Sequence, residues 1–139
     1  MEEVYKILVQ VPFGTLASIG SDGFAKATPL HFANDDANIY WFSAETSSHS
    51  QNISRNPRVN FAAYANDHLP NLRGVTVDNF AKSSSSKIDF AKAKNAFEEK
   101  FHELPEAFAK YKLYILPLGE IDNEKTSGMK FYLKGEKNE

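Results

Sequence analysis

The spacing of apolar residues divides the chain into helical and extended stretches. Over residues 1–11, apolar side chains recur every three or four positions until Pro12 ends the pattern, which predicts a short amphipathic helix. Three strand-like runs follow, FGTLASIG, FAKATPLHF and NIYWFS, and polar turn residues separate them. These runs predict an antiparallel meander. Because Pro29 has no N–H to donate within a sheet, the second strand is expected at an edge or a bulge.

The rest of the chain alternates helical patterns with further strands. A short helix is predicted to start at Ser47 or Ser48 and to end at Asn56-Pro57. The remaining predicted segments are strands at 58–64, 72–82, 111–121 and 129–133, a loop at 66–71, a Phe-rich helix at 88–103 and a polar tail at 134–139. This order predicts a mainly β fold, an antiparallel barrel with covering helices, in a single domain over residues 1–139.

Composition narrows the classes of function. The aromatic content of 13% favours a β-rich core. The net charge is -2, and acidic and basic residues are spread along the chain, so the sequence shows no basic cluster of the kind that binds nucleic acid. The absence of cysteine excludes disulfides and thiolate chemistry. The chain begins without the pattern of a signal peptide and contains no apolar run of about 18 residues, so we expect a cytoplasmic protein that does not bind membranes.

The densest group of polar residues, 43–52, lies between the third strand and the following helix. Hydroxyls, an imidazole and free N–H groups at a helix start are suited to holding a phosphate. The same residues are also typical of an ordinary helix cap, and the composition alone favours the cap.

Catalytic and metal-binding patterns are weak. Ser48 and His49 are neighbours without the orienting acid of a catalytic triad. The acidic residues of the second half form no convincing acid–base pair. No metal ligands are predicted, because the four histidines, His31, His49, His68 and His102, have no spacing typical of a metal site.

Residues 13–63 resemble the pyridoxamine 5'-phosphate oxidase-like family of FMN-binding split barrels. The resemblance lies in the segments GTLAS, TPL, IYWFS and SSH, followed by NI and NPRV, in this order and spacing. The later segments RGVTV, KF, DN and KFYL extend it to nearly the whole chain, in what looks like an uncharacterised bacterial branch. The resemblance implies a homodimer of six-stranded antiparallel split β-barrels with FMN at the interface.

The resemblance also implies which residues contact the cofactor. Those at the flavin would be Thr28, Pro29, Leu30 and His31, with a polar ring contact from Thr76; those at the phosphate would be Ser43, Ser47, Ser48 and His49. Members of this family commonly have Arg on the second strand and Lys on the phosphate loop, where this chain has Thr28 and His49. A hydrogen bond from a charged donor contributes about 1.5–3 kcal/mol, roughly twice a neutral one, so weaker phosphate binding is expected.

Two functions follow. The first is an FMN-dependent oxidoreductase of unknown substrate, in which the flavin supplies the electron chemistry and no protein acid or base is required. The second is a non-catalytic split-barrel module with weakened or lost flavin affinity, which binds another planar ligand, such as haem, or a protein partner.

Overall fold

The computed structural model describes residues 1–65 and 72–135. The predicted loop at 66–71 and the tail from residue 136 onward lie outside these residues. The helices and strands follow in the order α1 (Glu2–Gln10), β1 (Phe13–Ile19), β2 (Ala25–His31), β3 (Ala33–Asn34), β4 (Asn38–Ser43), α2 (Ser48–Arg55), β5 (Arg58–Ala65), β6 (Arg73–Phe80), β7 (Lys82–Ser84), α3 (Lys87–Phe101), α4 (Glu106–Ala109), β8 (Lys112–Pro117), β9 (Glu120–Ile121) and β10 (Lys130–Lys134).

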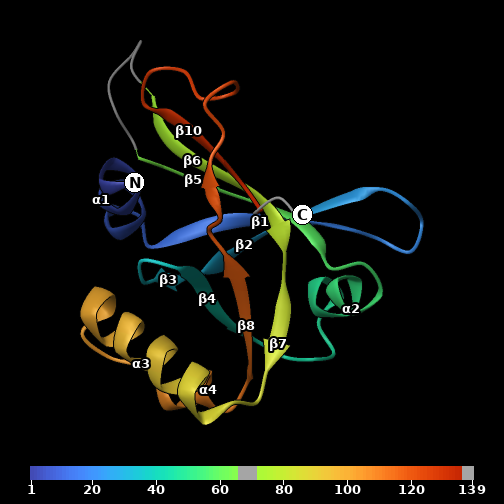
Figure 1. Cartoon of the computed structure of the whole chain (residues 1–139). Helices are drawn as coiled ribbons and strands as arrows, with labels where there is room; N and C mark the ends of the chain where they lie inside the picture. Colours follow the sequence, from blue (N-terminus) through green and yellow to red (C-terminus); the bar gives the residue numbers. More distant parts are fainter. Residues whose placement is uncertain (66–71, 136–139) are drawn as a thin grey trace.

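The strands form two sheets, which lie across each other in Figure 1. The six-stranded sheet has the order β2-β1-β5-β6-β10-β9, and the four-stranded sheet has the order β3-β4-β8-β7. The predicted mainly β class with covering helices is therefore confirmed, although the strands are more numerous than six. One pairing departs from the antiparallel expectation, because β10 runs parallel to β6, with Phe131 opposite Val75.

Two predicted strands are each split where the chain changes direction. Residues 72–82 continue from β6 into β7, and Ala81 marks the step from one sheet to the other. Residues 111–121 divide into β8 and β9 around Gly119, which has φ +72. A Cβ at Gly119 would overlap the carbonyl group of Lys134, so this turn requires glycine.

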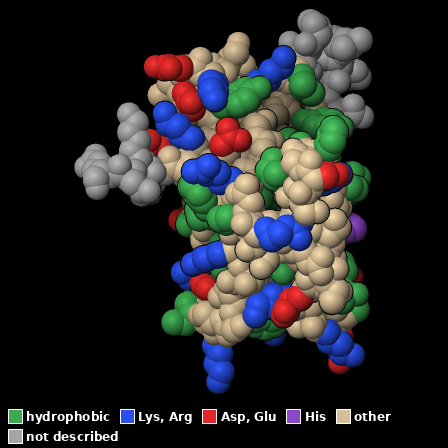
Figure 2. All heavy atoms as spheres, turned by 90° about the vertical axis from the view of Figure 1, so that its right-hand side faces the viewer, with side chains coloured by type: hydrophobic (Ala, Val, Ile, Leu, Met, Phe, Trp, Pro, Cys, Tyr) green, Lys and Arg blue, Asp and Glu red, His purple; other side chains and the backbone are tan. Residues whose placement is uncertain are grey.

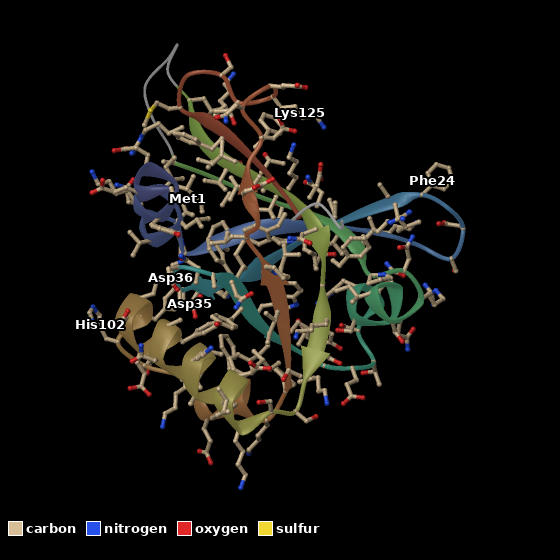
Figure 3. All side chains as sticks on the ribbon, in the orientation of Figure 1. Met1, Phe24, Asp35, Asp36, His102 and Lys125 are labelled. Carbon is tan, nitrogen blue, oxygen red and sulfur yellow. The ribbon has the colours of Figure 1, made fainter. Side chains whose placement is uncertain are left out.

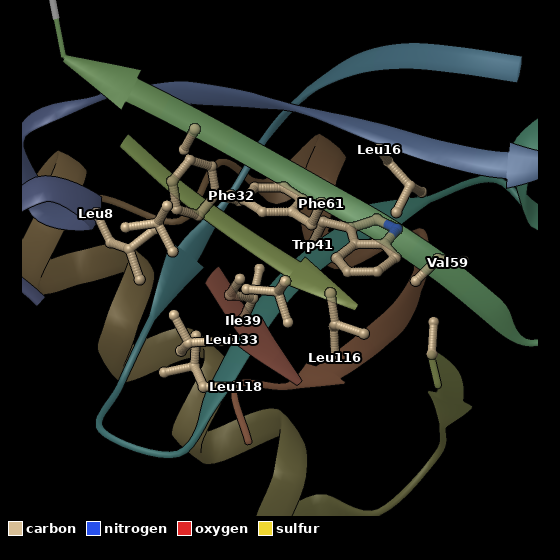
Figure 4. Packing of buried hydrophobic residues seen from close by; sticks show 14 of the residues in the cluster. Leu8, Leu16, Phe32, Ile39, Trp41, Val59, Phe61, Leu116, Leu118 and Leu133 are labelled. Atoms are coloured by element: carbon tan, nitrogen blue, oxygen red, sulfur yellow. The ribbon is translucent and has the colours of Figure 1, made fainter. Parts of the chain in front are cut away.

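The core lies between the inner faces of the two sheets. Inward residues alternate along each strand and meet across the sheet, as Leu16 on β1 does with Phe61 on β5 and Phe61 with Val77 on β6. Figure 4 shows Phe61 beside Phe32, whose ring centroid is 4.9 Å away. Gly14 is glycine because a Cβ there would overlap the ring of Phe61.

The helices cover the open sides of the barrel. Ser47 caps α2 as predicted by accepting a hydrogen bond from Ser50 N. Helix α3 packs Ala93 and Phe97 into a second apolar cluster against the four-stranded sheet. It ends two residues earlier than predicted because His102 has a left-handed φ of 66. The short helix α4 had no sequence prediction. None of the described helices is long and apolar enough to span a membrane.

Strand β2 is an edge strand of the six-stranded sheet, as Pro29 predicts. It continues from β1 through a hairpin that projects from the body of the protein, with Phe24 near its tip (Figure 3). Phe24 is 71% exposed. The free edge of β2 leaves backbone N–H and C=O groups without a strand partner.

Candidate functional site

The polar residues between β4 and α2 converge on one imidazole. Ser43 ends β4, and its Oγ lies 2.9 Å from Nε2 of His49 in the first turn of α2. The Oγ of Ser47 lies 3.4 Å from the same nitrogen and 2.7 Å from Oγ of Ser50. We call Ser43, Ser47, Ser48 and His49 the β4–α2 loop group. Ser48 is exposed at the helix start, where helix geometry leaves the N–H groups of Ser48 and His49 without intrahelical acceptors.

The imidazole of His49 is half-buried, and this burial lowers its pKa. A lowered pKa favours the neutral form of the imidazole at pH 7. The β4–α2 loop group therefore offers hydroxyls, N–H groups and a neutral ring. Figure 2 shows the face that carries α2 and the β1–β2 hairpin, where basic and acidic side chains are interspersed.

The four predicted residues on β2 point to two different sides. Thr28 lies opposite Leu16 of β1, on the inner face, and Leu30 shares that side. Pro29 lies opposite Thr15, on the outer face, and His31 shares that side. A ligand along the edge of β2 can therefore contact side chains from both faces and the unpaired backbone between them.

Thr76 lies apart from β2 within one chain. The register aligns Pro29 with Thr15, Thr15 with Ala62, and Ala62 with Thr76. Three strand spacings of about 4.8 Å separate Thr76 from Pro29, or about 14 Å. Thr76 shares the outer face with Pro29 and lies on the face opposite to Thr28. The structure thus places the predicted site residues in three groups, on β2, on the β4–α2 loop and on β6.

The outer face of the six-stranded sheet is rich in exposed apolar side chains. Phe13, Tyr64 and Phe80 are 57%, 64% and 51% exposed. By strand alternation they share this face with Thr15, Ile19, Ala62, Thr76 and Tyr132. Two shallow pockets of about 550 Å³ and 400 Å³ open on this face. Apolar patches of this kind are typical of interaction sites.

Aromatic rings surround His31 at the end of β2. Its ring centroid lies 6.0–6.1 Å from those of Phe13, Phe101 and Phe108. Phe13 comes from β1, while Phe101 ends α3 and Phe108 belongs to α4. The imidazole is exposed, so a planar ligand can reach it beside apolar rings.

Lys100 of α3 is a residue that the sequence analysis did not single out as functional. Its Nζ donates to the carbonyls of Phe32, at 2.9 Å, and Leu8, at 3.1 Å. It also lies 3.5 Å from the ring centroid of Phe32. Burial lowers its pKa to about 7. The signal for it was present, because Lys100 follows Phe97 by three positions and so falls on the buried stripe of α3.

Other chemistry is not evident in the described parts of the chain. Residues 1–65 and 72–135 contain no group of three or more His, Asp or Glu side chains placed to hold a metal ion. His31 and His49 lie on different elements with different surroundings, and His68 lies outside the described residues.

Solved structures share this fold. A conserved hypothetical protein from Mycobacterium tuberculosis matches with a TM-score of 0.70 and 22% identity, over 83% of this chain and 77% of that chain. The haem storage protein HutZ from Vibrio cholerae matches with a TM-score of 0.69 and 16% identity, over 84% and 87% of the two chains. An FAD-binding protein from Mesorhizobium loti matches with a TM-score of 0.64 and 22% identity, over 83% and 86%. These likenesses establish the split-barrel class of fold.

The family follows from the sequence itself. The family model described as pyridoxamine 5'-phosphate oxidase matches residues 1–116. No curated protein matches the chain. The chain therefore belongs to the pyridoxamine 5'-phosphate oxidase family, as its sequence motifs indicated.

Proposed function

We propose that this protein binds FMN between two copies of the chain and acts as an FMN-dependent oxidoreductase. The observation that carries the proposal is the convergence of the Ser43 and Ser47 hydroxyls on the imidazole of His49, which lies at the start of α2. Membership of the pyridoxamine 5'-phosphate oxidase family and the likeness to an FAD-binding protein support it. The donors present are suited to a phosphate, although none of the four side chains carries a fixed positive charge.

Each group of residues has a distinct task in this proposal. The β4–α2 loop group binds the phosphate through hydroxyls, the His49 ring and the N–H groups at the start of α2. The edge of β2, from Thr28 to His31, contacts the ring system with its backbone and side chains. Thr76 lies about 14 Å from β2, so we assign it to the half of the site supplied by the second copy. The flavin, when bound, supplies the electron chemistry.

FMN affinity is expected to fall as pH rises through the pKa of His49. A phosphate beside the ring favours its protonated form, and that charge attraction is lost when the ring becomes neutral. Burial lowers the pKa of His49 in the free protein and a bound phosphate raises it, so the fall should begin on the acid side of the ordinary value and end at the pKa of the complex. We expect the Kd for FMN, measured by quenching of flavin fluorescence, to rise about tenfold between about pH 5 and 8, since a charged hydrogen bond contributes roughly twice a neutral one.

The His49→Gln variant should bind FMN with a Kd that varies much less over this range, and His49→Lys should bind more tightly at pH 8. His102→Asn is the matched control, because His102 ends α3 on the side of the protein away from α2 (Figure 3). Riboflavin, which lacks the phosphate, should bind with a Kd that varies little over this range. The His49→Gln variant keeps the titration of the ligand's phosphate and so separates it from that of His49. A wild-type protein that does not quench FMN at micromolar concentration contradicts the proposed function, and a pH-independent Kd removes His49 from it.

A second candidate, a module that binds haem without catalysis, is favoured by the surroundings of His31. An exposed imidazole beside three phenylalanine rings combines an iron ligand with an apolar contact surface. The likeness to a haem storage protein supports this candidate.

Hemin titration tests the second candidate. We expect a sharpened and shifted Soret band on binding, because a histidine ligates the iron. His31→Ala should abolish the band shift, whereas the control variant His102→Asn should retain it. An unchanged spectrum with the wild-type protein, or the same shift with His31→Ala, argues against His31 as the ligand.

A further inference from the structure

A polar pocket of about 330 Å³ lies between helix α2 and strands β7 and β8. Its lining includes the serines Ser50, Ser54 and Ser83, the lysines Lys82 and Lys112, and the carboxylate of Glu45. We call it the α2–β7–β8 pocket. Its volume is at the lower end of the range for small-molecule sites, about 300–1,000 Å³.

This pocket adjoins the β4–α2 loop group, because Ser50 in its lining accepts a hydrogen bond from Ser47 Oγ at 2.7 Å, but its lining residues are different. None of the residues Ser43, Ser47, Ser48 and His49 lines it. Asn52 of α2 donates to Ser18 Oγ of β1 at 3.1 Å, so one flank of the helix faces β1. Ser50 and Ser54, which are four residues apart and so lie on one flank of a helix, line the pocket on the side of β7 and β8.

The charges and donors around the pocket are suited to an anion. Lys112 Nζ donates to Ser85 Oγ at 2.7 Å, and an ammonium group has three protons to donate. Among the described lining residues, Lys112 shares the strand face of Tyr114, whereas Lys82 lies opposite Ile115 on the other face. Residues that carry hydroxyl or ammonium groups, from three separate elements, line the same space. This combination is suited to a group with several acceptor oxygens around one centre.

We propose that the α2–β7–β8 pocket binds the phosphate group of a small phosphate monoester. Lys112 supplies the positive charge, and the serine hydroxyls donate to the remaining phosphate oxygens. Glu45 opposes the anion at the same pocket, so it limits the affinity and favours ligands that carry a donor or positive group next to the phosphate. The site does not depend on whether flavin binds at the β4–α2 loop group.

Titration with inorganic phosphate, followed by amide chemical shifts of the isotopically labelled full chain, tests this site. We expect saturable shifts at Ser50, Ser54 and Ser83. Loss of one charged donor in Lys112→Gln should raise the Kd at least about tenfold, because hydrogen bonds to charged groups are the stronger ones. Lys82→Gln should change it much less, because Lys82 lies opposite Ile115, on the face of β7 away from Tyr114. Glu45→Gln should lower the Kd.

The control variants distinguish this site from other sources of binding. Lys110→Gln removes the same charge from an exposed lysine outside the pocket and should leave the Kd within about twofold, since exposed charges contribute little. Shifts confined to Ser47, Ser48 and His49 would assign the binding to the β4–α2 loop group. Equal Kd values for phosphate in Lys112→Gln and Lys110→Gln would overturn the proposal. Tighter binding of citrate than of phosphate, with the same amide shifts, would also overturn it.

Discussion

Replacing Tyr64 by Glu is expected to convert the proposed homodimer into monomers. Tyr64 lies near the end of β5 on the outer sheet face, and its side chain is 64% exposed. Pairing two such faces would bury Phe13, Tyr64 and Phe80 against a second copy, whereas a carboxylate buried there would lack a partner. An unpaired buried charge costs about 3–5 kcal/mol, so the dimer dissociation constant should rise by at least about a hundredfold. Sedimentation measures this change directly.

The Tyr64→Glu variant should also bind FMN more weakly, because the proposed site needs a second copy to supply Thr76. Tyr111→Glu is the matched control, since Tyr111 is 49% exposed but lies next to β8, away from the outer sheet face. It should remain dimeric. Circular dichroism checks that both variants fold. A monomeric wild-type protein, or a dimeric Tyr64→Glu variant, contradicts the assignment of this face to the dimer.

Lys100 is expected to make the protein more stable as pH rises above neutrality. Burial lowers its pKa from 10.5 to about 7, so between these values the unfolded chain binds a proton that the folded protein has released. Stability rises with pH wherever the unfolded state binds more protons. Each pKa unit corresponds to about 1.4 kcal/mol. With allowance for partial exposure, the free energy of unfolding should rise by about 2–4 kcal/mol between about pH 7 and 10.

Urea unfolding of Lys100→Met at several pH values measures this contribution. The variant loses hydrogen bonds to Leu8 and Phe32 at every pH, so the slope of stability against pH is the informative quantity. Lys94→Met is the control, because Lys94 is an exposed lysine on the same helix. The slope should be reduced in Lys100→Met and retained in Lys94→Met. Parallel curves for the two variants would show that Lys100 does not cause the pH dependence.

Local signals predicted most of the fold. The cap at Ser47 and the break at Asn56-Pro57 define α2, and the edge position of β2 follows from the missing N–H of Pro29. The splitting of residues 72–82 at Ala81 had no local signal, because inward and outward side chains alternate in the same way before and after Ala81. The boundary exists only because β7 pairs with a strand of the second sheet. The parallel pairing of β10 with β6 was also beyond local patterns, since it joins segments more than fifty residues apart.

The site was less predictable than the fold, because it depends on contacts between distant segments. The Ser43–His49 contact spans six residues and could be anticipated from the polar run between them. The aromatic surroundings of His31 come from Phe13, Phe101 and Phe108, and no local pattern joins these positions. The roles of the nine predicted residues remain predictions, to be tested by the FMN and haem titrations.

The position of β10 has a consequence for synthesis of the protein. Strand β6 pairs with β5 as soon as residue 80 is available, but its other edge has no partner until residues 130–134 have been made. During that interval the nascent chain exposes an unpaired strand edge that contains Val75 and Val77. Such edges promote association between chains. A ribosome that stalls before the codon for Lys130 would therefore carry an aggregation-prone intermediate, and chaperones that act on nascent chains should bind most strongly at these lengths.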